Sequence, residues 1–229
     1  MAAIAMALGA RCWRRDSNPD ARILDSARLW LIDGTRKFSY ESVYFDTPDL
    51  RCFTDHVEGR RPRFKVRIRY YCEAGACFFE VKVRLAGDAM VKRQRPYATE
   101  DHGSITEPAR GFLEEVLAEL ADEPAPADLA PSLSTAYRRI TLSAKEAAER
   151  ATLDLQVGMR AMDGREVRLR EGSLLVETKT EEGDSRIDSE LRAAGCEAMS
   201  ISKYRLGVGL LLADDPDSAH ACALRTWSH

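Results

Sequence analysis

Basic side chains recur at every second position in two segments of the chain. Lys65, Arg67 and Arg69 form one series, and Lys82 and Arg84 form another. In a β-strand, side chains two positions apart lie on one face, about 7 Å from each other. Guanidinium and ammonium groups at that spacing match the oxygens of successive phosphate groups, which accept hydrogen bonds from both. The pattern therefore predicts a surface that binds a chain of phosphates.

Acidic residues are rare in the same alternating pattern. Glu80 and Glu177 share their predicted strand faces with basic residues. Phosphoryl transfer usually needs a divalent cation, and a carboxylate among basic groups is a natural ligand for it. Glu177 is therefore a candidate metal ligand, and a cross-strand salt bridge is its alternative role.

The patterns of several other chemistries are absent from the sequence. The four histidines are scattered, with no serine or cysteine partner at an informative spacing, so a catalytic triad is not expected. There is no GxxxxGK[ST] phosphate loop, and the glycines at 207 and 209 follow a helical segment, unlike a dinucleotide fingerprint. No aromatic RNA-binding motif lies among the arginines, so no nucleic-acid partner is expected.

Charge is unevenly distributed along the 229 residues. The net charge is −3, yet residues 60–95 hold eleven basic and three acidic residues, which leaves −11 for the rest. A chain that concentrates positive charge in this way is expected to have an anionic partner. No apolar run approaches the roughly 20 residues of a membrane span. The six cysteines form no CxxC pair, which favours reduced thiols and a cytoplasmic protein.

The periodicity of apolar residues predicts an α+β fold. Strands are expected at 38–45, 64–71, 79–84, 89–95, 135–142, 150–157 and 174–180, with a turn-containing excursion at 158–172. Helices are expected after Thr47 as its cap, at 107–120, from Ser185 to about 195, and at 200–213. Sequential strands of this kind indicate an antiparallel sheet or barrel with flanking helices.

Two arrangements could accommodate the charged strand faces. In a one-sided sheet, the faces would be solvated and would carry cross-strand ion pairs, such as Glu80 with Arg69. In a closed barrel, the same faces would turn inward and form a wet, basic tunnel that needs a polyanion. Five charged strand faces would repel one another on a one-sided sheet, which favours the tunnel.

Eight short segments resemble the vacuolar transporter chaperone (VTC) domain, and they occur in that family's order over residues 38–212. They are SVYFDTP (42–48), GRR (59–61), KVRIR (65–69), FEVK (79–82), VKR (91–93), YRR (137–139), VETK (176–179) and SISKY (200–204). The resemblance implies a triphosphate tunnel (CYTH-like) metalloenzyme, whose fold is a closed antiparallel barrel. It also implies a polyphosphate polymerase, which moves the terminal phosphoryl group of ATP onto polyphosphate with Mn²⁺ or Mg²⁺.

The resemblance assigns roles to individual residues. Arg67, Arg69 and Lys203 would be the catalytic set, and Glu177 the metal ligand. Further phosphate contacts would come from Arg60, Lys82, Lys92, Arg139, Lys179 and Ser202. Ser202 and Lys203 would lie at the start of the last helix, where the helix N-terminus favours an anion. Such a site transfers a phosphoryl group by positioning and charge neutralisation.

The N-terminal part departs from the family pattern. The family opens with a strand of acidic and basic residues, which is Glu-x-Glu-x-Lys in the wider superfamily, and residues 1–25 contain nothing similar. We therefore expect an atypical segment at 1–25, the tunnel domain at 26–213 with a barrel incomplete at its N-terminus, and a flexible tail at 214–229. Two other functions remain open, a tunnel-type triphosphate hydrolase and a non-catalytic binder of polyphosphate or another anion.

Overall fold

The structure, a computed structural model, describes most of the chain between residues 37 and 213. The described residues are 11–14, 27–29, 37–87, 89–144, 149–171, 173–179, 186–193, 196–199, 201–213 and 227–228. Within them, twelve strands form one sheet, and all of its paired strands are antiparallel. Four α-helices accompany this sheet, so the predicted α+β class is confirmed.

Nine strands lie side by side across the sheet. In order, they are β11 (Glu197–Met199), β1 (Arg11–Arg14), β10 (Leu174–Lys179), β8 (Arg150–Ala161), β7 (Ala130–Ala144), β3 (Phe38–Asp46), β4 (Arg63–Tyr71), β5 (Ala76–Arg84) and β6 (Met90–Tyr97). Most of the predicted strands are confirmed in this order, with ends shifted by a few residues. The alternation of apolar and charged residues therefore located the strands correctly.

Three shorter strands extend the sheet beside this series. β2 (Ala27–Leu29) pairs with β7, β9 (Glu166–Leu169) pairs with β8, and β12 (Trp227–Ser228) pairs with β9. β9 falls in the segment 158–172, where no strand was expected. There β8 continues to Ala161 and turns at Gly164, whose φ of 93° suits glycine, into the β8–β9 hairpin.

One face of β4, β5 and β6 packs against α3 (Glu107–Ala121). Val66, Ile68, Phe79 and Val81 point toward this side and are fully buried. The Phe112 ring of α3 meets the Phe79 ring edge-on, with centroids 6.2 Å apart. Because side chains alternate along a strand, the charged residues between these apolar ones point to the opposite face.

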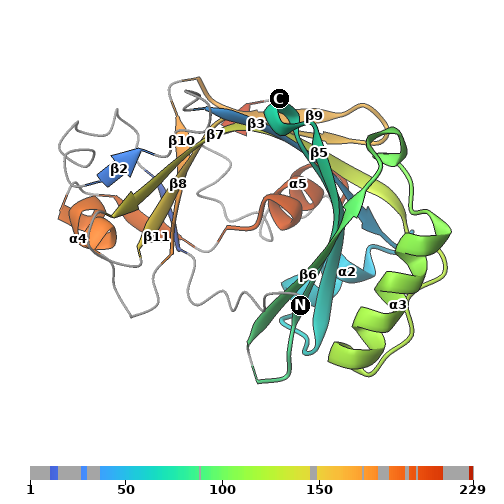
Figure 1. Cartoon of the computed structure of the whole chain (residues 1–229). Helices are drawn as coiled ribbons and strands as arrows, with labels where there is room; N and C mark the ends of the chain where they lie inside the picture. Colours follow the sequence, from blue (N-terminus) through green and yellow to red (C-terminus); the bar gives the residue numbers. More distant parts are fainter. Residues whose placement is uncertain are drawn as a thin grey trace.

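The sheet curves around α5 (Lys203–Leu211), while α3 lies on the outside of β5 and β6 (Figure 1). Gly207 allows α5 to approach the sheet closely, because an added Cβ there would lie 2.5 Å from Leu133 Cδ2 and 2.9 Å from Met159 Sδ. The Tyr204 hydroxyl donates a hydrogen bond to the buried Asp46 carboxylate. These contacts fix α5 against the face of the sheet that carries the charged residues.

The described sheet does not close into the full barrel of the family, which agrees with the expectation of an incomplete barrel. β6 pairs only with β5, and β11 pairs only with β1, so no described ladder joins the two ends of the sheet. β1 and β11 are also short, at four and three residues. The sheet is strongly curved and open along one side (Figure 1).

β1 lies within the segment 1–25, where no strand was expected. It pairs with β10 and β11, and its register places Cys12 beside Glu177 and Met199. Its sequence, RCWR, contains no acidic residue. A first strand is therefore present, but it brings no carboxylate to the sheet.

The helices differ from expectation mainly at their first residues. α2 (Arg51–Val57) begins after Leu50 in a left-handed conformation, and the Asp46 carboxylate accepts hydrogen bonds from the backbone N–H groups of Cys52 and Phe53. Thr47 is therefore not its N-cap residue, although its hydroxyl accepts a bond from the Arg51 N–H. α4 spans Arg186–Ala193, and the proposed cap Ser185 lies outside the described residues.

The last helix is shorter than the predicted range 200–213, because Ser202 is the N-cap residue of α5 and the helix ends at Leu211. Of the tail 214–229, the structure describes only residues 227–228. Among the described helices, none combines the length and apolar character that crossing a membrane requires.

Candidate functional site

Most of the charged residues selected from the sequence lie on the face of the sheet that α5 contacts. Strand pairing aligns them in rows, because Lys65 is opposite Lys82 and Lys82 is opposite Lys92. In the next row, Arg67 is opposite Glu80. We call this surface the basic face. Its charged members are Lys65, Arg67, Arg69, Glu80, Lys82, Lys92, Arg139, Asp154, Glu177, Lys179 and Lys203.

Glu80 is the centre of an ion network on β4, β5 and β6. Arg67 Nε lies 2.7 Å from Glu80 Oε2, and Lys92 Nζ lies 3.1 Å from Glu80 Oε1. Burial alone would raise the pKa of Glu80, but Arg67, Arg69 and Lys92 hold it far below its usual range. The predicted partner Arg69 is replaced by Arg67, because the register places Arg67, and not Arg69, opposite Glu80.

Asp154 organises a second network on β7, β8 and α5. Arg139 donates two hydrogen bonds to this carboxylate, from Nε at 2.6 Å and from Nη2 at 2.8 Å, and Lys203 Nζ donates a third. Burial alone would raise the pKa of Asp154, but Lys203 and Arg139 lower it. Asp154 was not among the site residues predicted from the sequence. Its alternation with Thr152 was visible, but its position beside Arg139 depends on the β7–β8 register.

Glu177 joins this second network from β10. Its Oε1 lies 3.2 Å from Lys179 Nζ, and its Oε2 lies 3.8 Å from Arg139 Nη2. Burial alone would raise the pKa of Glu177, but Lys179, Lys203 and Arg139 lower it to about 2. Arg139 therefore lies between two carboxylates, Asp154 and Glu177.

Arg69 and Lys82 differ from these paired cations. Arg69 donates to Ser42 Oγ at 3.3 Å and lies over the Tyr40 ring, 5.7 Å from its centroid. No residue of the described ranges forms a hydrogen bond or ion pair with the Lys82 ammonium group. Burial and the positive charges of Arg67 and Lys179 lower the pKa of Lys82 to about 7.

Three buried hydroxyl groups on the same face have no hydrogen-bond partner among the residues that the structure describes. They belong to Thr135, Tyr137 and Thr152. The Tyr137 ring stacks on Tyr40, with centroids 5.3 Å apart, and Lys203 Nζ lies 4.7 Å from the Tyr137 centroid. Hydroxyl donors beside surplus cations are suited to phosphate oxygens.

Two predicted site residues lie at the margins of the basic face. Arg60 is in the turn after α2, its side chain is 60% exposed, and it forms ion pairs with Asp55 and Glu58. Its described contacts do not join it to the basic face. Ser202 accepts hydrogen bonds from Lys65 Nζ at 2.9 Å and from the Arg205 N–H at 3.4 Å.

Of the three carboxylates on the basic face, only Glu177 is suited to bind a divalent cation. The described residues contain no cluster of three or more histidine, cysteine or acidic side chains. The side chains of Glu80 and Asp154 are 0% and 1% exposed, and cations occupy their oxygens, whereas Glu177 is 24% exposed. Mg²⁺ is commonly held by one or two carboxylates together with phosphate oxygens and water. Glu177 therefore fits a metal that binds with a phosphate ligand.

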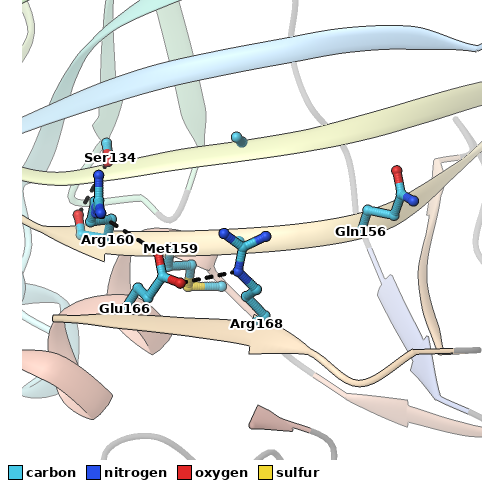
Figure 2. A pocket seen from close by; sticks show the side chains of 8 residues that line it. Ser134, Gln156, Met159, Arg160, Glu166 and Arg168 are labelled. Carbon is cyan, nitrogen blue, oxygen red and sulfur yellow. Dashed lines mark hydrogen bonds and ion pairs between the residues drawn. The ribbon is translucent and has the colours of Figure 1, made fainter. Parts of the chain in front are cut away.

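A separate hollow of about 270 Å³ lies on the outward face of β7, β8 and β9. Figure 2 labels Ser134, Gln156, Met159, Arg160, Glu166 and Arg168 around it. Arg160 and Arg168 both pair with Glu166, at 3.7 and 3.2 Å, and both are well exposed. Exposed pairs of this kind are weak and leave little net charge, so the basic face is the stronger candidate site.

Two solved structures resemble the chain over most of its length. A candidate adenylyl cyclase from Hippeastrum with a dominant triphosphatase activity has 16% identity and a TM-score of 0.50, covering 89% of this chain and 96% of that one. A candidate adenylate cyclase from Vibrio parahaemolyticus has 14% identity and a TM-score of 0.49, with coverage of 86% and 94%. The Hippeastrum structure shares the fold of this chain.

A search of curated protein sequences finds no match to this chain. The VTC domain family, in contrast, matches residues 10–212, which is most of the chain and includes β1. The predicted resemblance is thereby confirmed over a longer range than the eight segments covered. The chain belongs to the VTC domain family and has the triphosphate tunnel fold, with a sheet that is not closed.

Proposed function

We propose that the protein is a metal-dependent polyphosphate polymerase, which transfers the terminal phosphoryl group of ATP to polyphosphate on the basic face. The observation that carries the proposal is the charge of this face, which holds eight basic side chains and three carboxylates within the described residues. Phosphate chains supply the negative charge that such a surface needs. Membership of a triphosphate tunnel family agrees with this substrate class.

The paired and unpaired cations would have different tasks. Arg67 and Arg139 are oriented by Glu80 and Asp154, so their remaining N–H groups are fixed in position before a ligand arrives. Donors that need no reorganisation stabilise a transition state most effectively. Arg69 and Lys82 form no ion pair with a carboxylate among the described residues, so they can bind phosphate without breaking one.

The reaction needs no covalent bond to the protein. An oxygen of the terminal phosphate of the chain attacks the γ-phosphorus of ATP, the bond between the γ-phosphorus and its bridging oxygen breaks, and ADP leaves. Lys203, at the first turn of α5, would stabilise charge on the transferred group, and Lys92 and Lys179 would hold neighbouring phosphates. Arg60 and Ser202 would contact phosphates at the margin of the face.

Glu177 would hold the metal, Mn²⁺ or Mg²⁺, with phosphate oxygens completing its coordination. When bound, such a cation neutralises phosphate charge and orients the reacting groups. We also keep the prediction of a cytoplasmic protein. It is supported by Cys52, Cys72 and Cys77, which form no disulfide bond within the described residues.

The direct test is to incubate the full chain with ATP and Mn²⁺ and to follow the products by gel electrophoresis and ³¹P NMR. Growing chains would support the proposal, and Arg69→Ala should lower the rate by about 10²–10³-fold. Arg168→Gln, on the exposed outer surface, is the matched control and should leave the rate unchanged. Absence of both turnover and ATP binding would contradict the proposal.

A triphosphate hydrolase is a second candidate, because the Hippeastrum structure that shares this fold has a dominant triphosphatase activity. Release of orthophosphate without chain growth in the same assay would identify it. The lack of an acidic residue in β1 favours the polymerase, because hydrolysis needs carboxylates that hold metal and activate water. Salt-sensitive polyphosphate binding without turnover would identify a third possibility, a non-catalytic binder.

A further inference from the structure

Thr152 of β8 lies on the basic face, like Asp154 two positions further along the same strand. Its neighbour Ala151 packs on the other side of the sheet, in an apolar cluster that also contains Val176 of β10 and residues of α4. Because side chains alternate along a strand, Thr152 and Asp154 point away from that cluster. Glu177 follows Val176 on β10 and points away from the cluster in the same way.

The antiparallel register places Thr152 directly opposite Glu177. The two residues are cross-strand partners in the pairing of β8 with β10. Opposite residues of an antiparallel pair have their Cβ atoms about 4.5–5.5 Å apart on the same face. On its other side, Thr152 is opposite Thr141 of β7. Thr152 is therefore the residue of β8 that lies beside the carboxylate proposed to hold the metal.

The Thr152 hydroxyl group has no hydrogen-bond partner among the described residues, and the residue is only 6% exposed. A buried polar group without a partner is costly, and few are found in folded proteins. Thr178 of β10 shows the usual arrangement, because its buried hydroxyl donates a hydrogen bond to Asp188 at 2.6 Å. The lone pairs of the Thr152 oxygen are thus available to a bound group.

The other two unpartnered hydroxyl groups of the basic face have different neighbours. In the pairing of β3 with β7, Thr135 is opposite Ser42 and Tyr137 is opposite Tyr40. Of the three hydroxyl residues, Thr152 is the one whose cross-strand neighbour is a carboxylate. A neutral oxygen beside a carboxylate suits a cation better than it suits a second anion.

We infer that the Thr152 hydroxyl is a second ligand, next to Glu177, for Mn²⁺ or Mg²⁺, an assignment that rests on the proposed function. These hard cations bind oxygen atoms, and the hydroxyl of a phosphate-loop serine or threonine is a ligand of the same kind. Two adjacent strands would then contribute one oxygen ligand each. Phosphate oxygens and water would complete the coordination.

Tripolyphosphate binding with and without metal tests this role in the absence of turnover. Calorimetric titration of the full chain in EDTA and in excess Mn²⁺ gives the gain in affinity that depends on the metal. Thr152→Val keeps the shape of the side chain but removes the hydroxyl, so it should reduce this gain by about tenfold and leave the affinity in EDTA unchanged. Thr152→Ser, which keeps the oxygen, should retain most of the gain.

The substitution is expected to fold, because valine removes a buried hydroxyl that has no described partner and should leave the unfolding free energy unchanged or raise it. Thr141→Val, one strand farther from Glu177, is the matched control and should keep the full gain. No gain in the parent protein, a full gain in Thr152→Val, or equal losses in the two valine variants would overturn the inference. A loss of affinity in EDTA would overturn it too, because the hydroxyl would then contact phosphate.

The polymerase and the ligand assignment can fail separately. If ATP and Mn²⁺ yield no polymer but Thr152→Val still loses the metal-dependent gain, the metal ligand stands and the polymerase does not. If polymer forms and Thr152→Val needs no more Mn²⁺ than the parent protein, the polymerase stands and the assignment of Thr152 fails.

Discussion

Lys203, the first residue of α5, donates a hydrogen bond to the carboxylate of Asp154 in β8. Asp154 also accepts two hydrogen bonds from Arg139 of β7, so one buried carboxylate holds two cations from different elements. This contact fixes a proposed catalytic lysine relative to the sheet. It also means that the charge of Asp154 cannot be removed without leaving two cations side by side.

Asp154→Asn should therefore destabilise the protein strongly. Breaking a buried ion pair from one side typically costs about 3–5 kcal/mol, because the remaining charges lose their partner. Urea unfolding followed by circular dichroism measures the change in the free energy of unfolding. Asp163→Asn, which breaks only an exposed pair with Arg165, is the control and should have little effect. Equal effects of the two substitutions would contradict the proposed importance of Asp154.

Gly207→Ala should displace α5 from the sheet. The new methyl group would overlap the side chains of Leu133 and Met159, and overpacking of a core usually costs about 1–3 kcal/mol. The shift should also lower phosphate binding, because Lys203 is on the same helix. In Gly111→Ala, the added Cβ meets nothing within 4 Å on α3, so this variant should be as stable as the parent or slightly more stable. Thermal unfolding and phosphate titration of both variants test the prediction.

Lys82 should make stability depend on pH. Its pKa is about 7 in the folded chain, while the unfolded chain keeps the ordinary value of 10.5. Between these values the unfolded state binds more protons, so the contribution of Lys82 to stability rises with pH and is least below pH 7. Lys82→Met should therefore stabilise the protein most at pH 6 and reduce the pH dependence from 7 to 10, to which Lys65 still contributes because its pKa is also lowered to about 7. Urea unfolding of both proteins at several pH values tests this. A difference in unfolding free energy that stays constant with pH would contradict the prediction.

The same proton should influence anion binding. As the pH falls through about 7, Lys82 gains its charge and the basic face gains one cation that has no partner among the described residues. Calorimetric titration with polyphosphate should show tighter binding at pH 6 than at pH 8. Lys82→Met should reduce this difference in affinity between pH 6 and pH 8. If the difference is unchanged, other groups cause it.

Glu177→Gln should separate metal dependence from folding. Glu177 is partly exposed and pairs mainly with Lys179, so its loss should change the unfolding free energy much less than Asp154→Asn. If Glu177 holds the metal, the Mn²⁺ concentration needed for half-maximal activity should rise by at least about tenfold. A metal requirement that does not change would remove Glu177 from the proposed metal site.

The sequence predicted which side chains share a face but not which of them meet. Alternation along β4 and β5 placed Arg67, Arg69 and Lys82 together, and the structure agrees. The partner of Glu80 was wrong because a pairing register depends on both strands and on the turn between them. Asp154 was missed for the same reason, since its position beside Arg139 follows a register shift between Ala136 and Arg138 of β7, where β8 contains one extra residue.

How far the sheet closes was the other feature that the sequence could not settle. Periodicity describes each strand separately, whereas closure depends on hydrogen bonds between strands far apart in the chain. β1 was missed because four residues are too few to show a period. Arg60 illustrates a related limit, because its role was carried over from the family motif, and its described contacts are with neighbours in the sequence.

The open sheet has a consequence for how copies of the protein behave toward one another. An unpaired edge strand offers its backbone to the edge of another molecule, which is a route to aggregation. β6, which pairs only with β5 among the described strands, carries Lys92, Arg93, Arg95 and Pro96. Like charges repel a second copy of the same edge, and proline lacks the N–H that a new ladder would use. Lys92, which the proposal assigns to phosphate binding, therefore also helps to keep the molecules apart in concentrated solution.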